Sequence, residues 1–208
     1  MYKLLALIVA TLVVRALGHA RVTTPTPRNL GAAAQAACGA AVYKVLTSGI
    51  FLSRVLHQSC INAALIDLTG PLENANAKID SAYNAEACHL YFCRGAQYQD
   101  NVNNTRVYKA GTVVPFHVDL VAHHTGWANV SVVNLATQTP IARLFTWPVY
   151  ANESLSPADW PKNETDFEVT VPNLGTQCSQ PNACAIQWWW YSGYGNHQTY
   201  ENCVDFTQ

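Results

Sequence analysis

The C-terminal half of the chain has the hydrophobic pattern of β-strands. In its first apolar stretch Val114, Phe116 and Val118 alternate with other residues, as in a strand with one buried face. Strand-like stretches of this kind cover residues 112–121, 129–135, 167–171, 184–191 and 199–206. Turn-rich segments at residues 155–159 and 172–175 separate some of them. The pattern predicts an all-β fold, an immunoglobulin-like antiparallel β-sandwich with long loops and short helices.

The N-terminal half of the chain lacks this alternation of apolar and polar residues. Pro25, Pro27 and Gly31 precede an alanine-rich run, which predicts long loops with short helical pieces. Residues 44–66 are apolar with few turn residues, and two interpretations stay open: a helix packed on the sandwich, or sequence foreign to the fold, such as a retained intron. With no repeat and no long linker, we expect a single domain over residues 19–208, with residues 44–66 as an atypical segment.

Residues 1–18 have the pattern of a secretory signal peptide. Lys3 forms a basic start, residues 4–14 are apolar, and small residues follow. The apolar run is too short to span a bilayer. Cleavage after Gly18 and cleavage after Ala20 both satisfy the small-residue rule. We therefore expect a secreted, extracellular protein that begins at His19 or at Arg21.

Composition narrows the choice of partner. Only 12% of the residues are charged and the net charge is −1, so the sequence predicts no binding to nucleic acid or to membranes. Six Trp and ten Tyr suit β-sheet cores and also surfaces that stack on sugar rings. Residues 187–191 place Trp on both faces of one predicted strand, where core packing is expected and a sugar platform is the alternative.

Cysteines and glycosylation signals agree with export. In a chain that enters the secretory route, the seven cysteines are better interpreted as disulfides than as metal ligands, and Cys60 is the hardest to pair. Four Asn-x-Ser/Thr sequons predict N-glycosylation, at Asn103, Asn129, Asn152 and Asn163.

His19 is the candidate metal ligand if cleavage follows Gly18. An N-terminal histidine offers two nitrogens, its α-amine and its imidazole, and copper(II) prefers nitrogen ligands in a tetragonal arrangement. A third nitrogen from another histidine would complete a T-shaped brace. Cleavage after Ala20 would remove the site.

Three segments carry a resemblance to fungal lytic polysaccharide monooxygenases and the related chitin-binding type-4 domains. HARVTTPTPR, residues 19–28, resembles the family's mature start, with a histidine followed by a proline-rich segment that ends in arginine. HHTG, residues 123–126, resembles the loop of the second copper histidine, which implies His124, with His123 in reserve. QTYENC, residues 198–203, is similar to the family's Q-x-Y-x-x-C strand.

The resemblance implies a role for each matched residue. His19 and His124 would bind one copper ion, Tyr200 would occupy its axial side, and Gln198 would contact the oxygen-binding region. In alternating strand geometry Glu201 points away from the face of Tyr200, so we leave it out of the site.

The same frame suggests a disulfide pattern. Cys88–Cys93 and Cys178–Cys184 would be local bridges, and Cys38–Cys203 would tie the N-terminal region to the strand of Tyr200.

The function that the resemblance implies is oxidative cleavage of chitin or cellulose by a secreted, monomeric copper enzyme with an external electron donor. Two alternatives stay open. The chain could be a non-catalytic copper-binding protein of the same fold, or a metal-free chitin-binding module, which cleavage after Ala20 would favour.

Overall fold

Two β-sheets form the body of the protein in the computed structural model, which describes residues 19–47, 70–194 and 197–208. The predicted signal peptide, Cys60 and most of the atypical segment lie outside these residues. Strands β1 (His19–Thr24), β3 (Val113–Ala122) and β6 (Asp166–Thr170) form a sheet in the order β1-β3-β6.

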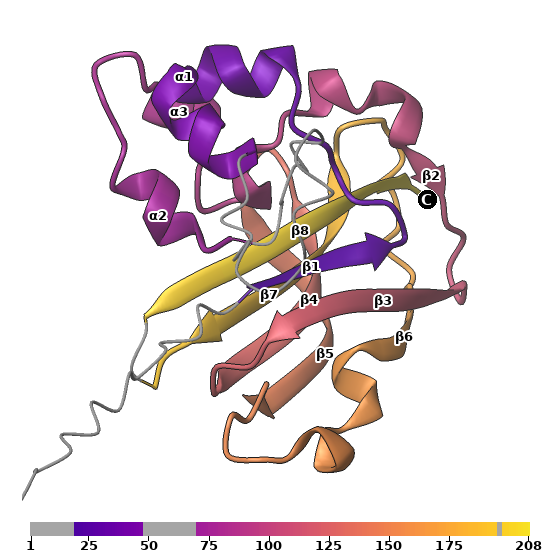
Figure 1. Cartoon of the computed structure of the whole chain (residues 1–208). Coiled ribbons are helices and arrows are strands. Elements are labelled where there is room, and N and C mark those ends of the chain that lie inside the picture. Colours follow the sequence, from indigo (N-terminus) through magenta and orange to yellow (C-terminus); the bar gives the residue numbers. More distant parts are fainter. Residues whose placement is uncertain (1–18, 48–69, 195–196) are drawn as a thin grey trace, which may run out of the picture.

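The second sheet has five strands in the order β2-β8-β7-β4-β5. Its members are β2 (Arg106–Val107), β4 (Gly126–Asn134), β5 (Thr139–Tyr150), β7 (Cys184–Ser192) and β8 (Gln198–Thr207). All neighbours are antiparallel except β2 and β8, which run parallel. The two sheets form a sandwich, so the predicted fold class is confirmed (Figure 1).

Alternating side chains fill the space between the sheets. On β3 the predicted alternation holds, since Val114, Phe116 and Val118 are all buried. They join a core that includes Trp188 and Trp190 of β7, so these two Trp of the predicted strand pack inside, as expected. Burial of each large apolar side chain contributes roughly 1.5–3 kcal/mol relative to exposure.

Short helices form a separate small layer beside β8 (Figure 1). The helices of this layer and its loops are α1 (Ala32–Thr47), α2 (Leu72–Asn76), α3 (Ala85–Cys88), η1 (Cys93–Gly95), η2 (Tyr98–Asp100) and η3 (Val102–Asn104). Two more turns, η4 (Pro157–Asp159) and η5 (Lys162–Glu164), lie between β5 and β6. Within α1 the helix breaks at Gly39, whose φ of 76° suits glycine. Lys44 to Thr47 of the atypical segment form the last turn of α1.

Because this layer covers its outer face, β8 is buried on both sides. Val204 and Phe206 face the inter-sheet core, while Cys203 and Asp205 face the helices and loops. Arg28 fixes the N-terminal segment to this outer face: its backbone N–H donates to the carbonyl of Cys203, 2.8 Å away. Its guanidinium pairs with both carboxylate oxygens of Asp205 at 2.7 Å.

Two of the three predicted disulfides are wrong. The structure joins Cys38 to Cys88 and Cys93 to Cys203, and it joins Cys178 to Cys184 as predicted. Cys38 and Cys88 lie on two helices of one small apolar core. Cys93 lies in η1 against the outer face of β8, where Cys203 projects. Closeness in sequence therefore misleads for Cys88 and Cys93, because the chain reverses between them.

Glu201 is a fully buried carboxyl on this outer face. It accepts hydrogen bonds from the backbone N–H of Arg94, at 3.2 Å, and from the side-chain amide of Gln187, at 2.8 Å. Burial raises the pKa of Glu201 to about 8, although the neighbouring Arg94 opposes the shift. Its side chain points away from the Tyr200 face, as strand alternation predicts.

We expect Glu201 to make the stability of the protein depend on pH. Because its pKa is higher in the folded state than its ordinary value of 4.5, folding takes up a proton between about pH 5 and pH 8. The free energy of unfolding should therefore fall as pH rises through this range, by at most about 1.4 kcal/mol per pH unit. Glu201→Gln, which stays neutral, should flatten the slope in urea unfolding at pH 5, 6.5 and 8. An unchanged slope would contradict the assignment.

Candidate metal centre

His124 occupies the three-residue connection between β3 and β4. Its side chain is only 8% exposed. Its Nδ1 lies 3.2 Å from Oε2 of Glu153, and because an ionised carboxylate can only accept, Nδ1 carries the proton. In the neutral ring Nε2 then presents a lone pair, and this buried nitrogen has no hydrogen-bond partner among the described residues. An oriented imidazole with a free nitrogen is the usual form of a metal-binding histidine.

Glu153 is a site residue that the sequence did not predict. It follows β5, 29 residues after His124, and its backbone N–H donates to Oγ1 of Thr125 at 3.1 Å. This bond holds the carboxylate beside the histidine loop. No local motif marks Glu153 apart from the glycosylation sequon that contains it, so only the fold brings it to the site.

His123, the reserve candidate, is engaged elsewhere. Its ring stacks on Trp160 with centroids 3.6 Å apart and planes 17° apart. Burial, and then the neighbouring His124, lower the pKa of His123. The stacking turns its ring toward the segment after β5, so the structure favours His124 as the ligand of this loop.

The backbone of His19 lies at the same end of the sandwich. His19 pairs with Ala122 across β1 and β3, and Ala122 is two residues before His124. The side chain of His19 is outside what the structure describes. Further along β1, the backbone N–H of Val22 donates to Oδ1 of Asn202 at 2.8 Å, which holds β1 against β8.

Tyr200 lies near the start of β8, at this end of the five-stranded sheet. The strand register places Tyr200 opposite Trp190, which in turn is opposite Ala128, four residues after His124. The Tyr200 ring stacks on Trp190 at 4.4 Å, and its hydroxyl donates to Oε1 of Gln198 at 2.7 Å. Burial, followed by the nearby charge of Glu73, raises the pKa of Tyr200, so the phenol stays protonated at neutral pH.

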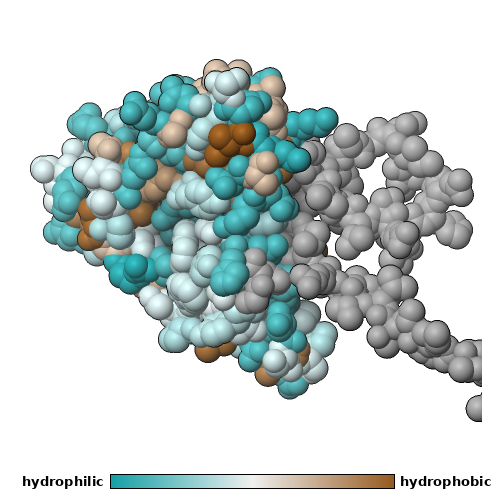
Figure 2. All heavy atoms as spheres, turned by 90° about the vertical axis from the view of Figure 1, so that its left-hand side faces the viewer, coloured by the Kyte–Doolittle hydropathy of each residue, from teal (hydrophilic) through white to brown (hydrophobic). Residues whose placement is uncertain are grey.

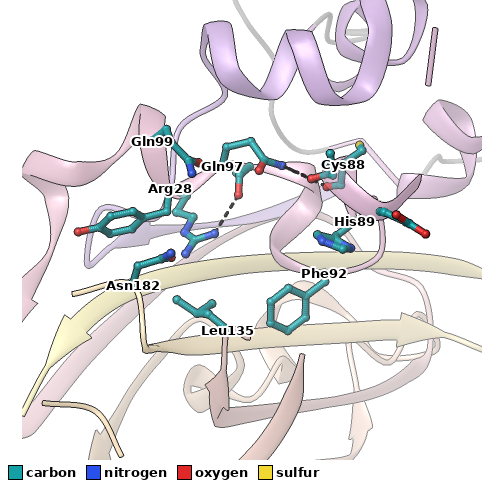
Figure 3. Close-up of a pocket in the computed structure, with 12 residues that line it drawn as sticks. Arg28, Cys88, His89, Phe92, Gln97, Gln99, Leu135 and Asn182 are labelled. Atoms are coloured by element: carbon teal, nitrogen blue, oxygen red, sulfur yellow. Dashed lines mark hydrogen bonds between the residues drawn. The ribbon is translucent and has the colours of Figure 1, made fainter. Parts of the chain in front are cut away.

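A pocket of about 270 Å³ lies away from this end (Figure 3). Leu135, which follows the far end of β4, lines it together with Arg28 and Gln97. The polar groups of Arg28 and Gln97 already bind the protein itself: Arg28 pairs with Asp205, and Gln97 donates to three backbone carbonyls. This pocket is a structural junction, and none of the predicted copper-site residues lines it.

Among the described side chains, no three or more of His, Cys, Asp or Glu are grouped to hold a metal. A brace of the expected kind needs only one described imidazole, that of His124, together with the amine and imidazole of residue 19. The helices of the described segments include none with the length and hydropathy of a membrane span.

The fold and the end of the sandwich that carries His19 and His124 define a class of protein. In this class the β1 strand begins at a histidine, and the β3–β4 loop holds a second, oriented histidine. The family model for lytic polysaccharide mono-oxygenases, described as cellulose-degrading, matches residues 19–206. The chain belongs to this family.

Two solved structures are similar to this chain at low identity. A chitin-binding domain from Burkholderia pseudomallei is 16% identical, and the match covers 91% of this chain and 100% of that one with a TM-score of 0.37. The CBM33 protein of Bacillus amyloliquefaciens, solved in complex with Cu(I) after photoreduction, is 13% identical, with a TM-score of 0.33. That match covers 50% of this chain and spans only 55% of the Bacillus chain. No curated protein matches.

Glu153 gives a test of how the histidine is oriented. In Glu153→Ala the imidazole loses the acceptor that fixes its proton on Nδ1, so we expect a 10- to 100-fold loss of copper affinity, roughly the effect typical of outer-shell partners. Glu153→Gln keeps an oxygen acceptor and should lose less. Calorimetric titration of copper(II) into each mature protein measures the difference, and equal affinities in all three proteins would contradict the role.

Proposed function

We propose that this protein is a secreted copper-dependent polysaccharide monooxygenase that cleaves chitin or cellulose chains oxidatively. The observation that carries the proposal is the buried, unpartnered Nε2 of His124, oriented by Glu153 at the end of the sandwich where β1 starts at His19. The family match also starts at His19, which supports cleavage after Gly18 and a free amine on that histidine.

The donor set suits copper. Two imidazoles and one amine are nitrogen ligands of the kind that copper(II) prefers, and His124 already has its proton fixed on the other ring nitrogen. Copper held there would supply the one-electron chemistry for oxidising a sugar chain. An external donor would provide the electrons, and oxygen or peroxide would be the oxidant.

The chain's own residues would shape this site. Tyr200 is held as a neutral phenol by burial and by the nearby charge of Glu73, and its ring stacks on Trp190. Oε1 of Gln198 accepts the hydrogen bond from the phenol hydroxyl, which leaves the side-chain amide N–H₂ as a donor for a small polar species. Glu153 and Thr125 keep His124 in place.

The surface at this end also suits a neutral polymer. Figure 2 views the molecule from the side where β8 begins. The visible surface is mostly hydrophilic or of intermediate hydropathy, with scattered hydrophobic residues. With a net charge of −1, the chain has little electrostatic preference for charged partners. We include secretion as a monomer, glycosylation of the four sequons and an external electron donor in the proposal.

The test compares two forms of the mature protein. One begins at His19, and the control begins at Gly18, so that the same histidine lacks a free amine. Each is loaded with copper and incubated with chitin or cellulose and ascorbate, and products are analysed by mass spectrometry. We expect oxidised oligosaccharides only from the first form.

The other outcomes separate the alternatives. Tight copper binding by the first form without oxidised products would indicate a non-catalytic copper-binding protein. Retention on chitin with no difference in copper affinity between the two forms would indicate a metal-free binding module. N-terminal sequencing of the secreted protein decides whether cleavage follows Gly18 or Ala20.

A further inference from the structure

The outer face of the five-stranded sheet carries an aromatic strip, which we define as Trp127 of β4 with Trp189 and Tyr191 of β7. The solvent side of a sheet is normally polar, yet Trp127 is 39% exposed and the other two are half-buried. The ring centroids of Trp127 and Tyr191 are 4.9 Å apart, and those of Trp127 and Trp189 are 6.3 Å apart. The side chains of this strip are not part of the inter-sheet core, because the core contains Trp188 and Trp190, which point the other way.

Asn129, one of the four sequon asparagines, lies inside this strip. It directly faces Trp189 across β4 and β7, while Trp127 faces Tyr191 one pair further along. Trp127 is also two residues before Asn129 on β4, so both project from the same face. Directly opposed side chains on a sheet have Cβ atoms about 5 Å apart, so a sugar on the amide of Asn129 can reach the Trp189 ring, and Trp127 is its neighbour on the same face of β4.

The side chain of Asn129 is free to carry a sugar. Its Oδ1 accepts a hydrogen bond from Oγ of Ser131, the hydroxyl residue of the same sequon, at 3.2 Å. Its Nδ2 has no hydrogen-bond partner among the described residues. On its other side Asn129 faces Thr146 of β5, which is exposed. Hydroxyl groups therefore flank Asn129 on β4 and β5, Arg143 lies opposite Ser131, and aromatic rings lie on the β7 side.

The geometry of the strip favours a short, flexible sugar over a crystalline polymer. The Trp127 ring is tilted by 49° from Trp189 and by 65° from Tyr191, so the three rings form no flat platform. A pyranose ring attached at Asn129 can instead place its C–H face against one indole while its hydroxyls stay in water, the arrangement that suits aromatic side chains with one wet side.

None of the other sequons has an exposed aromatic side chain two residues earlier, although Trp160, 38% exposed, is three residues before Asn163. Two residues before Asn152 is Tyr150, which is fully buried in the core. The residues at the same distance before Asn103 and Asn163 are Asn101 and Pro161. Asn129 alone of the four has an exposed aromatic side chain two residues earlier on its own strand.

We propose that Asn129 carries an N-linked glycan whose first sugar packs on Trp127 and Trp189 and covers the aromatic strip. The sugar is transferred from a lipid-linked diphosphate oligosaccharide: the bond from its C1 to the phosphate oxygen breaks, a bond from C1 to Nδ2 forms, one amide proton is lost, and the lipid diphosphate leaves. The inference rests on the proposed secretion, because this transfer occurs in the secretory route.

The test is a double-mutant cycle in protein secreted from a eukaryotic host. Asn129→Gln removes the glycan, and we expect it to lower the melting temperature by about 2–4 °C, the shift that a modest contact produces in a domain of this size. In the Trp127→Ala background the same change should shift the melting temperature by a smaller amount, because one of the two rings that contact the sugar is already lost. Asn103→Gln is the matched control and should have no effect in either background.

Further measurements keep the proposal falsifiable if Trp127→Ala folds poorly. Ser131→Ala also removes the sequon and should reproduce the effect of Asn129→Gln. Enzymatic trimming to a single sugar should preserve the melting temperature, since the first sugar makes the contact. Equal shifts in both backgrounds would overturn the proposal.

Peptide mass spectrometry separates this inference from the proposed secretion. Glycan on Asn103 or Asn163 but not on Asn129 would overturn the inference while leaving export intact, and no glycan on any sequon would count against both. An unmodified Asn129, together with weaker retention of Trp189→Ala on chitin or cellulose, would show that the strip binds external polysaccharide instead.

Discussion

His124→Ala should lower the copper affinity of the mature protein by at least about 100-fold, more than the loss of an outer-shell partner costs, because it removes one of the three proposed nitrogen ligands. His123→Ala should leave the affinity within about threefold. The physical reason is that the two adjacent imidazoles have different surroundings. Nε2 of His124 is buried and has no hydrogen-bond partner among the described residues, whereas the His123 ring is stacked on Trp160.

The measurement is calorimetric titration of copper(II) into protein that begins at His19, with the electron paramagnetic resonance spectrum as a second readout. The spectrum of His123→Ala should match that of the unmodified protein, and the spectrum of His124→Ala should lose the nitrogen couplings of one imidazole. If His123→Ala is the variant that loses copper, the assignment of the ligand is wrong.

The second large effect concerns stability. Arg28→Ala should lower the free energy of unfolding by about 3–5 kcal/mol, because the carboxylate of Asp205 would be left buried without its partner. The side chains of this pair are only 7% and 1% exposed, and two hydrogen bonds of 2.7 Å join them. Loss of the pair would also release the N-terminal segment from β8.

Arg21 provides the matched control for Arg28. Its ion pair with Asp119 is longer, 3.7 Å, and its partners are 36% and 44% exposed, so Arg21→Ala should cost no more than about 1 kcal/mol. Urea unfolding followed by tryptophan fluorescence gives both values. Similar losses in the two variants would mean that the buried pair contributes no more than a surface one.

The strands that alternate clearly could be predicted from the sequence, and β5 could not. Residues 112–121 and 184–191 correspond to β3 and β7, whose inward positions are apolar and buried. β5 escaped prediction because it is an edge strand with three register shifts against β4 and prolines at 140 and 148. Proline is tolerated at an edge, where its missing N–H removes no ladder bond.

For the site too, short sequence motifs could be predicted, whereas contacts between residues far apart in the sequence could not. The histidine loop and the strand of Tyr200 are short motifs, so the sequence could indicate both. Glu153 and the Arg28–Asp205 pair depend on residues 29 and 177 positions apart, and no local pattern reports such contacts. The disulfides failed for the same reason, since Cys93 pairs with Cys203 across 110 residues.

The Cys38–Cys88 bridge has a consequence for how the chain can vary in length. It closes a loop that includes residues 48–69, and Leu46 and Leu72, close to either side of that stretch, lie in the same small apolar core. The residues that flank the stretch are therefore fixed in one core that the disulfide also joins. For a closed loop, each doubling of length costs only about 0.6 kcal/mol of closure entropy. This position is where the protein can gain or lose chain, by natural insertion or by design, while the sandwich and its histidines stay as they are.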